Sequence, residues 1–194
     1  SCPQFFYNRI PPNNALRPPN RAWICQRFRN SYHYATLYDT GRRIPVYSAY
    51  IYKPGRGDRY KSWFVEPQLI KPNYHKNMDE ASSIENRYNI SPEKIGKSQA
   101  INQDYRKLQG LNRGHLNPSG HQSGDRSKWA TFTLTNIVPQ DSTLNQGAWN
   151  EYETQTMDEL THGCKTTYVI TGAVPGKTYI AKKRVNVPSH IWSA

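Results

Sequence analysis

Alternation of apolar and polar positions, together with β-branched and aromatic side chains, predicts strands along the chain. The clearest case is residues 131–138 (Thr-Phe-Thr-Leu-Thr-Asn-Ile-Val), a strand that we expect to end at Pro139. In the first half, two such segments flank a loop that contains a glycine, a pattern typical of a hairpin. The predicted strands are 35–38, 44–52, 131–138, 165–171 and 185–192.

One helix is predicted after the strand at 131–138. Residues 143–146 (Thr-Leu-Asn-Gln) have the form of a capping box, so the helix is expected to begin at Thr143 and to run to about His162. Gly163 is the expected left-handed stop. The helix is expected to bury one stripe, formed by residues at three- and four-residue steps: Trp149, Tyr152, Thr156 and Leu160.

These elements predict an α+β fold with a mainly antiparallel sheet and helices packed on it. A chain of 194 residues has the length of one domain. The first thirty residues are rich in proline, so we predict an irregular extension (1–30) packed on a domain that spans 31–194. Residues 54–62 are expected to form a mobile basic loop, and residues 71–103 are expected to form loops with short helical turns.

Charge adds a first functional indication. The chain carries 26 Lys and Arg against 14 Asp and Glu, a formal net charge of +12. A folded chain this basic is typical of proteins that bind nucleic acid, anionic lipid or sulfated glycan, although a surface that only favours solubility has the same composition. Its 14 Tyr and 5 Trp exclude a disordered chain, and no apolar run reaches the ~18 residues of a membrane-spanning helix.

The three cysteines, Cys2, Cys25 and Cys164, show no zinc-site spacing. We predict a Cys2–Cys25 disulfide that ties down the N-terminal segment and leaves Cys164 unpaired. A chain that starts at Ser-Cys-Pro, without an initiator Met, is typical of a secreted protein after signal removal, so an extracellular location is expected. Three unpaired thiols in a cytosolic chain are the alternative.

Three polar motifs follow one another in the second half of the chain. They are residues 111–117 (Leu-Asn-Arg-Gly-His-Leu-Asn), 135–140 (Thr-Asn-Ile-Val-Pro-Gln) and 144–149 (Leu-Asn-Gln-Gly-Ala-Trp), followed by Glu153. This set resembles the DNA/RNA non-specific endonucleases, the Serratia-type ββα-metal nucleases that include mitochondrial endonuclease G. It is most similar to the secreted endonuclease-domain-containing proteins of vertebrates. The similarity extends upstream to 63–67 and downstream to 187–192, so it spans most of the chain.

The resemblance implies a ββα-metal nuclease motif and a secreted, Mg²⁺-dependent endonuclease without sequence preference. Such an enzyme hydrolyses DNA, RNA or both to 5′-phosphate and 3′-hydroxyl ends, with Mn²⁺ or Ca²⁺ as alternative ions. Phosphate contacts supply its affinity, so it needs no contacts that read the bases. The alternative is a catalytically weakened nuclease fold that binds nucleic acid or glycan through its basic surface without cleaving it.

His115 is the candidate general base. Activating water near neutral pH requires a base whose pKa lies close to 7, and the ordinary pKa of histidine, about 6.5, meets this requirement. The histidine of the family motif has this role, and the resemblance carries it to His115. A lone histidine is otherwise more often a hydrogen-bonded structural residue. His121, six residues later, is a weaker candidate.

Asn145 aligns with the family's direct protein ligand to magnesium. A carboxamide oxygen is a hard donor, and a single protein ligand leaves Mg²⁺ the waters that it releases reluctantly. The alternative is a helix N-cap, but Thr143 competes for that position. Glu153 lies eight residues after Asn145, within a quadrant of the same helix face. The resemblance implies that Glu153 orients metal-bound water, and a solvent-facing acid is the alternative.

The resemblance assigns three further roles. Arg113 would hold substrate phosphate, which its planar guanidinium suits. Asn136 would anchor the site by hydrogen bonds. The family has an arginine two residues before the Trp of the upstream motif, where it stabilises charge on the reacting phosphate. This chain has Lys61 at that spacing, so either Lys61 or Arg59 is expected to supply the positive charge.

Two departures from the family pattern stand out. The usual Asp-Arg-Gly-His reads Asn112-Arg-Gly-His115 here, and the loss of that carboxylate predicts reduced activity rather than none. The sequence also stops at Ala194, where family members usually continue, so the nuclease domain is expected to lack its C-terminal end. A partner for Cys164 in that missing part is the alternative to a free thiol.

Overall fold

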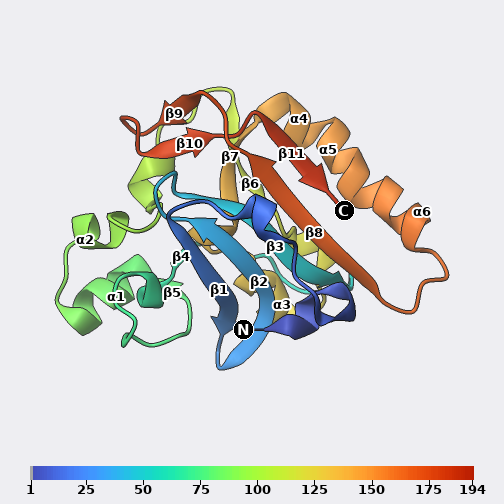
Figure 1. The fold of residues 1–194 in the computed structure, drawn as a ribbon, viewed down its shortest axis with the longest axis horizontal. Helices are drawn as coiled ribbons and strands as arrows, with labels where there is room; N and C mark the ends of the chain where they lie inside the picture. Colours follow the sequence, from blue (N-terminus) through green and yellow to red (C-terminus); the bar gives the residue numbers. More distant parts are fainter. Residues whose placement is uncertain (1) are drawn as a thin grey trace.

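The computed structural model describes residues 2–194, and its central element is a five-stranded antiparallel sheet (Figure 1). The strand order is β1-β2-β3-β8-β11. These strands are β1 (Arg21–Phe28), β2 (Ser31–Asp39), β3 (Ile44–Tyr52), β8 (Thr167–Val174) and β11 (His190–Ser193). The expected hairpin is confirmed, because β2 and β3 pair antiparallel across the loop between them.

Helices and three short two-stranded ribbons complete the fold, which confirms the predicted α+β class. The ribbons pair β4 (Phe64–Val65) with β5 (Asp79–Glu80), β6 (Leu111–His115) with β7 (Ile137–Asp141), and β9 (Thr178–Ile180) with β10 (Val185–Val187). The helices are α1 (Ala81–Tyr88), α2 (Pro92–Gly96), α3 (Asp125–Ala130), α4 (Ser142–Gln146), α5 (Ala148–Glu151) and α6 (Met157–Thr161). The short helices between 71 and 103 agree with the expectation for that region.

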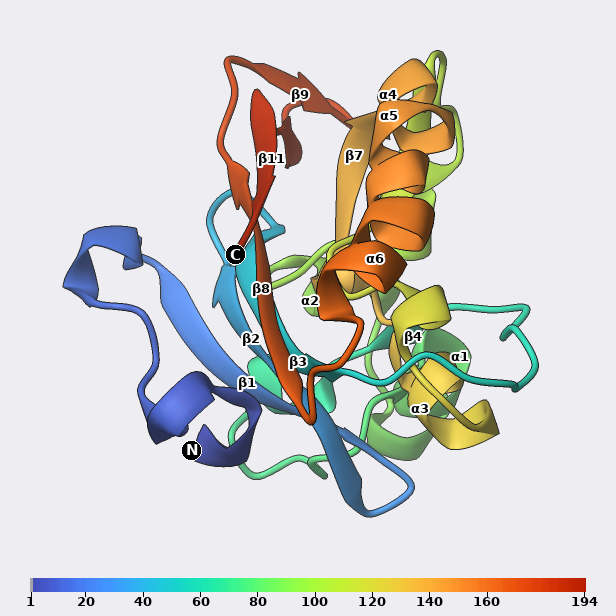
Figure 2. The ribbon, with the colours of Figure 1, turned by 90° about the vertical axis from the view of Figure 1, so that its right-hand side faces the viewer.

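The two faces of the sheet are covered by different parts of the chain. Figure 2 shows the N-terminal segment on one face and the β6–β7 ribbon with α4, α5 and α6 on the other. On the N-terminal side, buried Phe5 and Phe6 pack with Leu37 and Tyr47 of the sheet. The other side holds the larger core. The ribbon and the helices that follow it are therefore fixed against a rigid sheet.

The predicted disulfide of the N-terminal segment is confirmed, but the irregular segment predicted for residues 1–30 is shorter than expected. Cys2 and Cys25 form the expected disulfide, with Cα atoms 5.8 Å apart, while Cys164 is exposed and unpaired among the described residues. Residues 21–28 form β1 rather than irregular structure, because their alternate side chains turn inward against the core. Within residues 2–194, none of the helices has both the length and the apolarity that a membrane crossing requires.

The strand predicted at 131–138 is wrong over most of its length. Thr131 ends α3, residues 134–136 form a 3₁₀ turn, and the strand β7 starts only at Ile137 and continues through Pro139 to Asp141. The alternation does not reflect an inner and an outer face, because Thr131, Thr133 and Thr135 are as fully buried as the apolar residues between them. Their hydroxyls make hydrogen bonds in the interior instead of facing water.

The single helix predicted from Thr143 to about His162 is also corrected. Asp141, not Thr143, caps α4, since its Oδ1 accepts from the Leu144 N–H at 2.9 Å. The helical segment is then interrupted at Gly147 and by a π turn at Tyr152–Thr156. Leu160 is 68% exposed, and the buried side chain of this part is Met157. Helical structure ends at Thr161, and Gly163 has the left-handed φ of +81° that was predicted for it.

Candidate active site

The β6–β7 ribbon and α4 lie next to one another and form one compact motif. The register pairs Leu111 with Asp141 and His115 with Ile137, and α4 begins directly after β7 at Ser142. Gly114 lies in β6 against the Gln140 side chain, and a Cβ at this position would overlap the Gln140 carboxamide. Only glycine therefore allows β6 to approach β7 closely enough to place His115 at the end of the ribbon.

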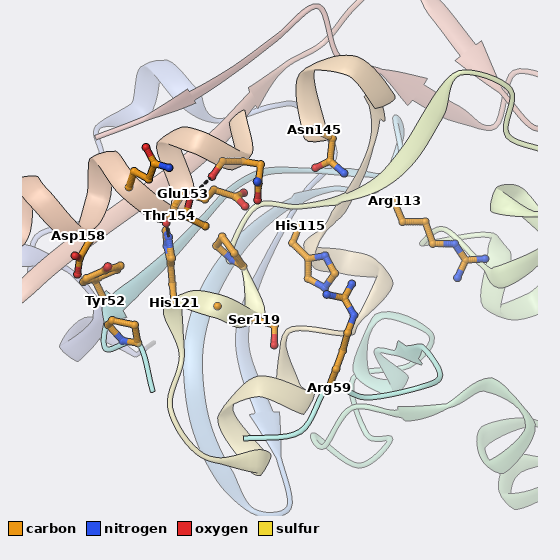
Figure 3. A pocket seen from close by; sticks show the side chains of 15 residues that line it. Tyr52, Arg59, Arg113, His115, Ser119, His121, Asn145, Glu153, Thr154 and Asp158 are labelled. Atoms are coloured by element: carbon orange, nitrogen blue, oxygen red, sulfur yellow. Dashed lines mark hydrogen bonds between the residues drawn. The ribbon is translucent and has the colours of Figure 1, made fainter. Parts of the chain in front are cut away.

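Five of the predicted site residues line one open cavity of about 580 Å³. Figure 3 shows Asn145 and Glu153 facing it from the α4–α6 side and His115 facing it from β6. The other two are Arg59, from the loop after β3, and Arg113. Lys61 is exposed and does not line the cavity, and Asn136 is fully buried beneath it.

The His115 ring is held between aromatic side chains. Its centroid lies 4.7 Å from that of Phe132 and 5.6 Å from that of Trp63. The Nε2 atom is shielded from solvent and has no hydrogen-bond partner within residues 2–194. Burial, and secondarily the positive charge of Arg59, lowers the pKa of His115 to about 3. In this arrangement the imidazole is neutral, but its pKa lies well below the value near 7 that a general base requires. The role of base therefore requires the ring to be opened to water.

Arg59 lies close to the His115 ring. In Figure 3 its guanidinium lies beside the imidazole, and its guanidinium carbon is 4.9 Å from the Phe132 ring centroid. The loop that carries it is anchored to the N-terminal end of α3, since the Gly124 N–H donates to the Arg56 carbonyl at 2.7 Å and the Asp58 N–H to Asp125 Oδ1 at 2.7 Å. Of the two candidate cations, the structure thus brings Arg59 to the cavity and leaves Lys61 outside it.

Replacing Arg59 with alanine is expected to raise the pKa of His115 from about 3 toward the ordinary value of 6.5. The substitution removes a positive charge that disfavours the imidazolium, and it opens the ring to water, so both changes act in the same direction. An NMR titration of the ring protons measures the shift. Lys61→Ala is the matched control and should leave the pKa unchanged, whereas an unchanged pKa in Arg59→Ala would show that Arg59 does not cover the ring.

Asn145 and Glu153 form the candidate metal site. No hydrogen bond within residues 2–194 occupies the Asn145 carboxamide, and burial raises the pKa of Glu153 to about 7 against the opposing effect of the Trp149 side chain. No lysine or arginine of the described residues forms an ion pair with Glu153. A neutral oxygen donor and a carboxylate without a cationic partner face the same cavity, which is a donor set that suits a hard divalent cation. The residues present therefore fit the ion.

Arg113 lines the edge of the cavity rather than its centre. Its guanidinium packs over the rings of Trp63, at 4.9 Å, and Tyr105, at 5.5 Å, and it points away from His115 in Figure 3. Burial lowers the pKa of Arg113 from its ordinary value. An arginine has a pKa high enough to remain charged, so this side chain still presents a cation at the mouth of the cavity.

Asn136 connects the sheet to the segment that follows His115. Its Oδ1 accepts from the Ser48 hydroxyl at 2.9 Å and from the Asn117 N–H at 3.0 Å. Its Nδ2 donates to the carbonyls of Asn117 and Thr131, both at 3.0 Å. All four interactions are buried, so Asn136 fixes the backbone two residues after His115 without reaching the cavity.

The sequence named His121 only as a weaker candidate base and did not indicate Glu66. His121 is almost fully buried, and its ring nitrogens lie within hydrogen-bond distance of Tyr50 and of the Glu153 carbonyl. Glu66 is fully buried and accepts from Thr133 and Thr135, and burial raises its pKa to about 7. A carboxylate directly after the apolar Phe64-Val65 pair was a usable signal for Glu66, whereas nothing in the spacing of His121 indicated its partners.

A family model described as DNA/RNA non-specific endonuclease matches residues 11–194. The chain belongs to this family. The resemblance indicated by the three polar motifs is thereby confirmed.

Individual members of the DNA/RNA non-specific endonuclease family are also similar to this chain. The Endonuclease domain-containing 1 protein of Homo sapiens is 38% identical over 198 residues, which cover 100% of this chain and 38% of that protein. Endonuclease G, mitochondrial, of Homo sapiens is 37% identical over 106 residues, or 48% of this chain and 35% of that protein. The chain thus spans well under half the length of these curated relatives.

The fold of this family member also matches a solved structure. A chain from the crystal structure of the EndoG/EndoGI complex superposes with a TM-score of 0.54 at 24% identity, over 85% of this chain and 65% of that one. This likeness supports the fold alone. It agrees with the arrangement described above, in which β6, β7 and α4 form a ββα unit packed on the antiparallel sheet.

Proposed function

We propose that this chain is a Mg²⁺-dependent endonuclease that hydrolyses phosphodiester bonds of DNA, RNA or both without sequence preference, with Mn²⁺ and Ca²⁺ as alternative ions. The observation that carries the proposal is the neutral, unpartnered Nε2 of His115 beside a cavity that Asn145 and Glu153 also line. A protein that only binds polyanions has no need of a shielded base next to a set of metal donors. Membership of a nuclease family supports the same conclusion.

Substrate binding would depend on phosphate contacts. The chain has a net charge of +12, and Arg59 and Arg113 place cations at the cavity. A phosphate that enters the cavity pairs with the Arg59 guanidinium and draws it from the His115 ring, which exposes Nε2 to the attacking water. Because these contacts involve only the backbone of the nucleic acid, binding is sequence-independent and weakens as salt rises.

The hydrolytic step follows from the position of His115. Its Nε2 accepts a proton from the water whose oxygen attacks phosphorus. The bond between phosphorus and the 3′ oxygen breaks, and the leaving 3′ oxygen takes a proton from solvent water. Asn145 would hold Mg²⁺ through its carboxamide oxygen, and Glu153 would orient a water of the ion. When bound, the ion stabilises negative charge on the phosphate and on the leaving 3′ oxygen. The products carry a 5′-phosphate and a 3′-hydroxyl.

The departure at Asn112 lies outside this machinery. Asn112 does not line the cavity, and its Oδ1 accepts from the Ser142 hydroxyl at 3.1 Å, which links β6 to the start of α4. The amide therefore performs a connecting role that a carboxylate would also perform. This geometry supports an active enzyme rather than a weakened, binding-only fold.

Incubation of supercoiled plasmid and of a structured RNA with the protein, in Mg²⁺ or in EDTA, tests the proposal. We expect nicked and then linear plasmid in Mg²⁺ only, with 5′-phosphate ends that accept ligation. Mn²⁺ and Ca²⁺ are run in parallel to cover the alternative ions. Salt-dependent binding of the nucleic acid without cleavage in any of the three ions would refute the enzyme and leave a binding protein.

We also propose that the protein is extracellular. The Cys2–Cys25 disulfide is typical of proteins that fold in an oxidising compartment.

A further inference from the structure

The helical segment that carries Glu153 contains a π turn, Tyr152–Thr156, between α5 and α6. In this turn the Met157 N–H reaches back five residues to the Tyr152 carbonyl, where an α-helix would reach back four. A π turn adds one residue to the helix locally, and such insertions are frequent at functional sites. The insertion changes which side chains face the cavity and which face the core.

Met157 and Glu153 of this segment face different surroundings. Met157 is 5% exposed and packs in the core with Tyr50 and Val169, while Glu153 lines the cavity. Each residue of an α-helix turns the chain by about 100°. Without the extra residue of the π turn, the direction of the Glu153 side chain relative to that of Met157 would therefore differ by about 100° from the one observed. The π turn thus allows Met157 to stay in the core while the Glu153 carboxylate faces the cavity.

The carbonyl of Glu153 is bound by a histidine from another part of the chain. His121 is 3% exposed, its Nε2 lies 2.6 Å from the Glu153 carbonyl oxygen, and its Nδ1 lies 2.7 Å from the Tyr50 hydroxyl. A carbonyl only accepts, so Nε2 carries the proton. With Nε2 donating to the carbonyl, Nδ1 is the nitrogen that meets the Tyr50 hydroxyl, so both ring nitrogens have partners. The ring also packs edge-on against Tyr52, with centroids 4.8 Å apart.

We propose that His121 is a positioning residue, which holds the π turn by donating its Nε2 hydrogen to the Glu153 carbonyl and so directs the Glu153 carboxylate into the cavity. The catalytic consequence rests on the proposed function, while the structural consequence does not. Tyr50 lies in β3, so the connection ties the helical segment to the rigid central sheet. His121 is therefore not a second base, because both ring nitrogens are engaged.

A matched pair of amide variants isolates the hydrogen bond to Glu153. The amide of His121→Gln extends about as far as the histidine Nε2 and can still donate to the carbonyl, whereas the amide of His121→Asn extends only about as far as Nδ1. We expect His121→Asn to lower kcat by about 10- to 100-fold with little change in KM, as for other residues that orient a metal site from outside it, and His121→Gln to recover most of the rate. His33→Asn, at a part-buried histidine that contacts Ser127 outside the cavity, is the control and should leave kcat unchanged.

A double-mutant cycle distinguishes positioning from general damage. If His121 acts through Glu153, then His121→Asn should reduce kcat much less in a Glu153→Gln background than in the wild type. Equal losses in both backgrounds, or equal activity of the Asn and Gln variants, would overturn the proposal. Should His121→Asn be too unstable to assay, His121→Phe fills the same space without donating and takes its place in the cycle.

A structural readout keeps this test separate from the proposed function. Crystal structures and amide hydrogen exchange of the wild type and the two amide variants show whether residues 152–156 keep the π turn. We expect faster exchange there and a displaced Glu153 side chain in His121→Asn only. An unchanged turn in His121→Asn would refute the role of His121 even if the chain proved to be an active nuclease. A chain without nuclease activity would refute the proposed function, and this readout would still decide the role of His121.

Discussion

His115→Ala is expected to lower the rate of phosphodiester cleavage by about 10²–10⁴-fold or more, which is the range associated with loss of a positioned general base. The physical reason is that the His115 ring is neutral and its Nε2 has no hydrogen-bond partner beside the cavity. The other buried histidine at the cavity, His121, has hydrogen-bond partners at both ring nitrogens. Binding of duplex DNA in EDTA should stay within about twofold of the wild type, since phosphate contacts to Arg and Lys supply the affinity. Rates on plasmid in Mg²⁺ and affinities in EDTA measure the two effects.

Two controls complete this experiment. His190→Ala removes an exposed histidine of β11 whose ring lies within hydrogen-bond distance of the Ser189 hydroxyl and does not line the cavity, so this variant should cleave like the wild type. Added imidazole should restore part of the activity of His115→Ala, because the vacated space between Phe132 and Trp63 matches the ring. Cleavage by His115→Ala within a few-fold of wild type would show that another group removes the proton.

The candidate site could be assembled from sequence because its residues lie in short motifs with fixed neighbours. The Gly114-His115 pair fixes the approach of β6 to β7, and β7 leads directly into the helix that carries Asn145. The resemblance of these motifs to the nuclease family predicted that His115, Asn145 and Glu153 form one site, and the structure brings all three to one cavity. Their chemical roles remain proposals.

Sequence patterns failed where polar groups are satisfied inside the protein. The threonines of 131–135 were interpreted as the outer face of a strand, but Thr133 and Thr135 donate to the buried carboxyl of Glu66. No local pattern distinguishes a hydroxyl that faces water from one that meets a distant partner, here more than sixty residues away in sequence. Long-range pairing of this kind appears only in the folded chain.

The helix was predicted imperfectly for a related reason. Helical periodicity assumes a constant turn per residue, and the π turn at Tyr152–Thr156 breaks that assumption. Residues after the turn are rotated relative to those before it, so the predicted stripe ends at the exposed Leu160 while Met157 takes the buried position. The hydrogen bond from His121 to the Glu153 carbonyl comes from outside the helix, so the spacing of residues within the helix could not predict it.

Asn145→Ala is expected to lower the cleavage rate and to raise the Mg²⁺ concentration needed for half-maximal activity, both by at least about tenfold. Asn145 is the only carboxamide of the proposed donor set, and without it the ion would be held by contacts through water alone. Saturating Mg²⁺ should recover part of the rate, whereas it should not rescue His115→Ala. A Mg²⁺ titration of plasmid cleavage measures both parameters.

The same substitution should leave the stability of the protein nearly unchanged, because Asp141 and not Asn145 caps α4. Asp141→Ala is the matched control: loss of the cap should cost about 1 kcal/mol of unfolding free energy while the half-maximal Mg²⁺ concentration stays close to that of the wild type. Thermal melts of the two variants, in EDTA to exclude any effect of the ion, separate the two roles. If Asn145→Ala lowered the Tm as Asp141→Ala does and left the Mg²⁺ titration unmoved, Asn145 would be a structural residue of the helix and the metal ligand would have to be sought among the other residues that line the cavity. A lower Tm in Asp141→Ala only, with a shifted Mg²⁺ titration in Asn145→Ala only, would show that Asp141 stabilises α4 and that Asn145 binds the ion.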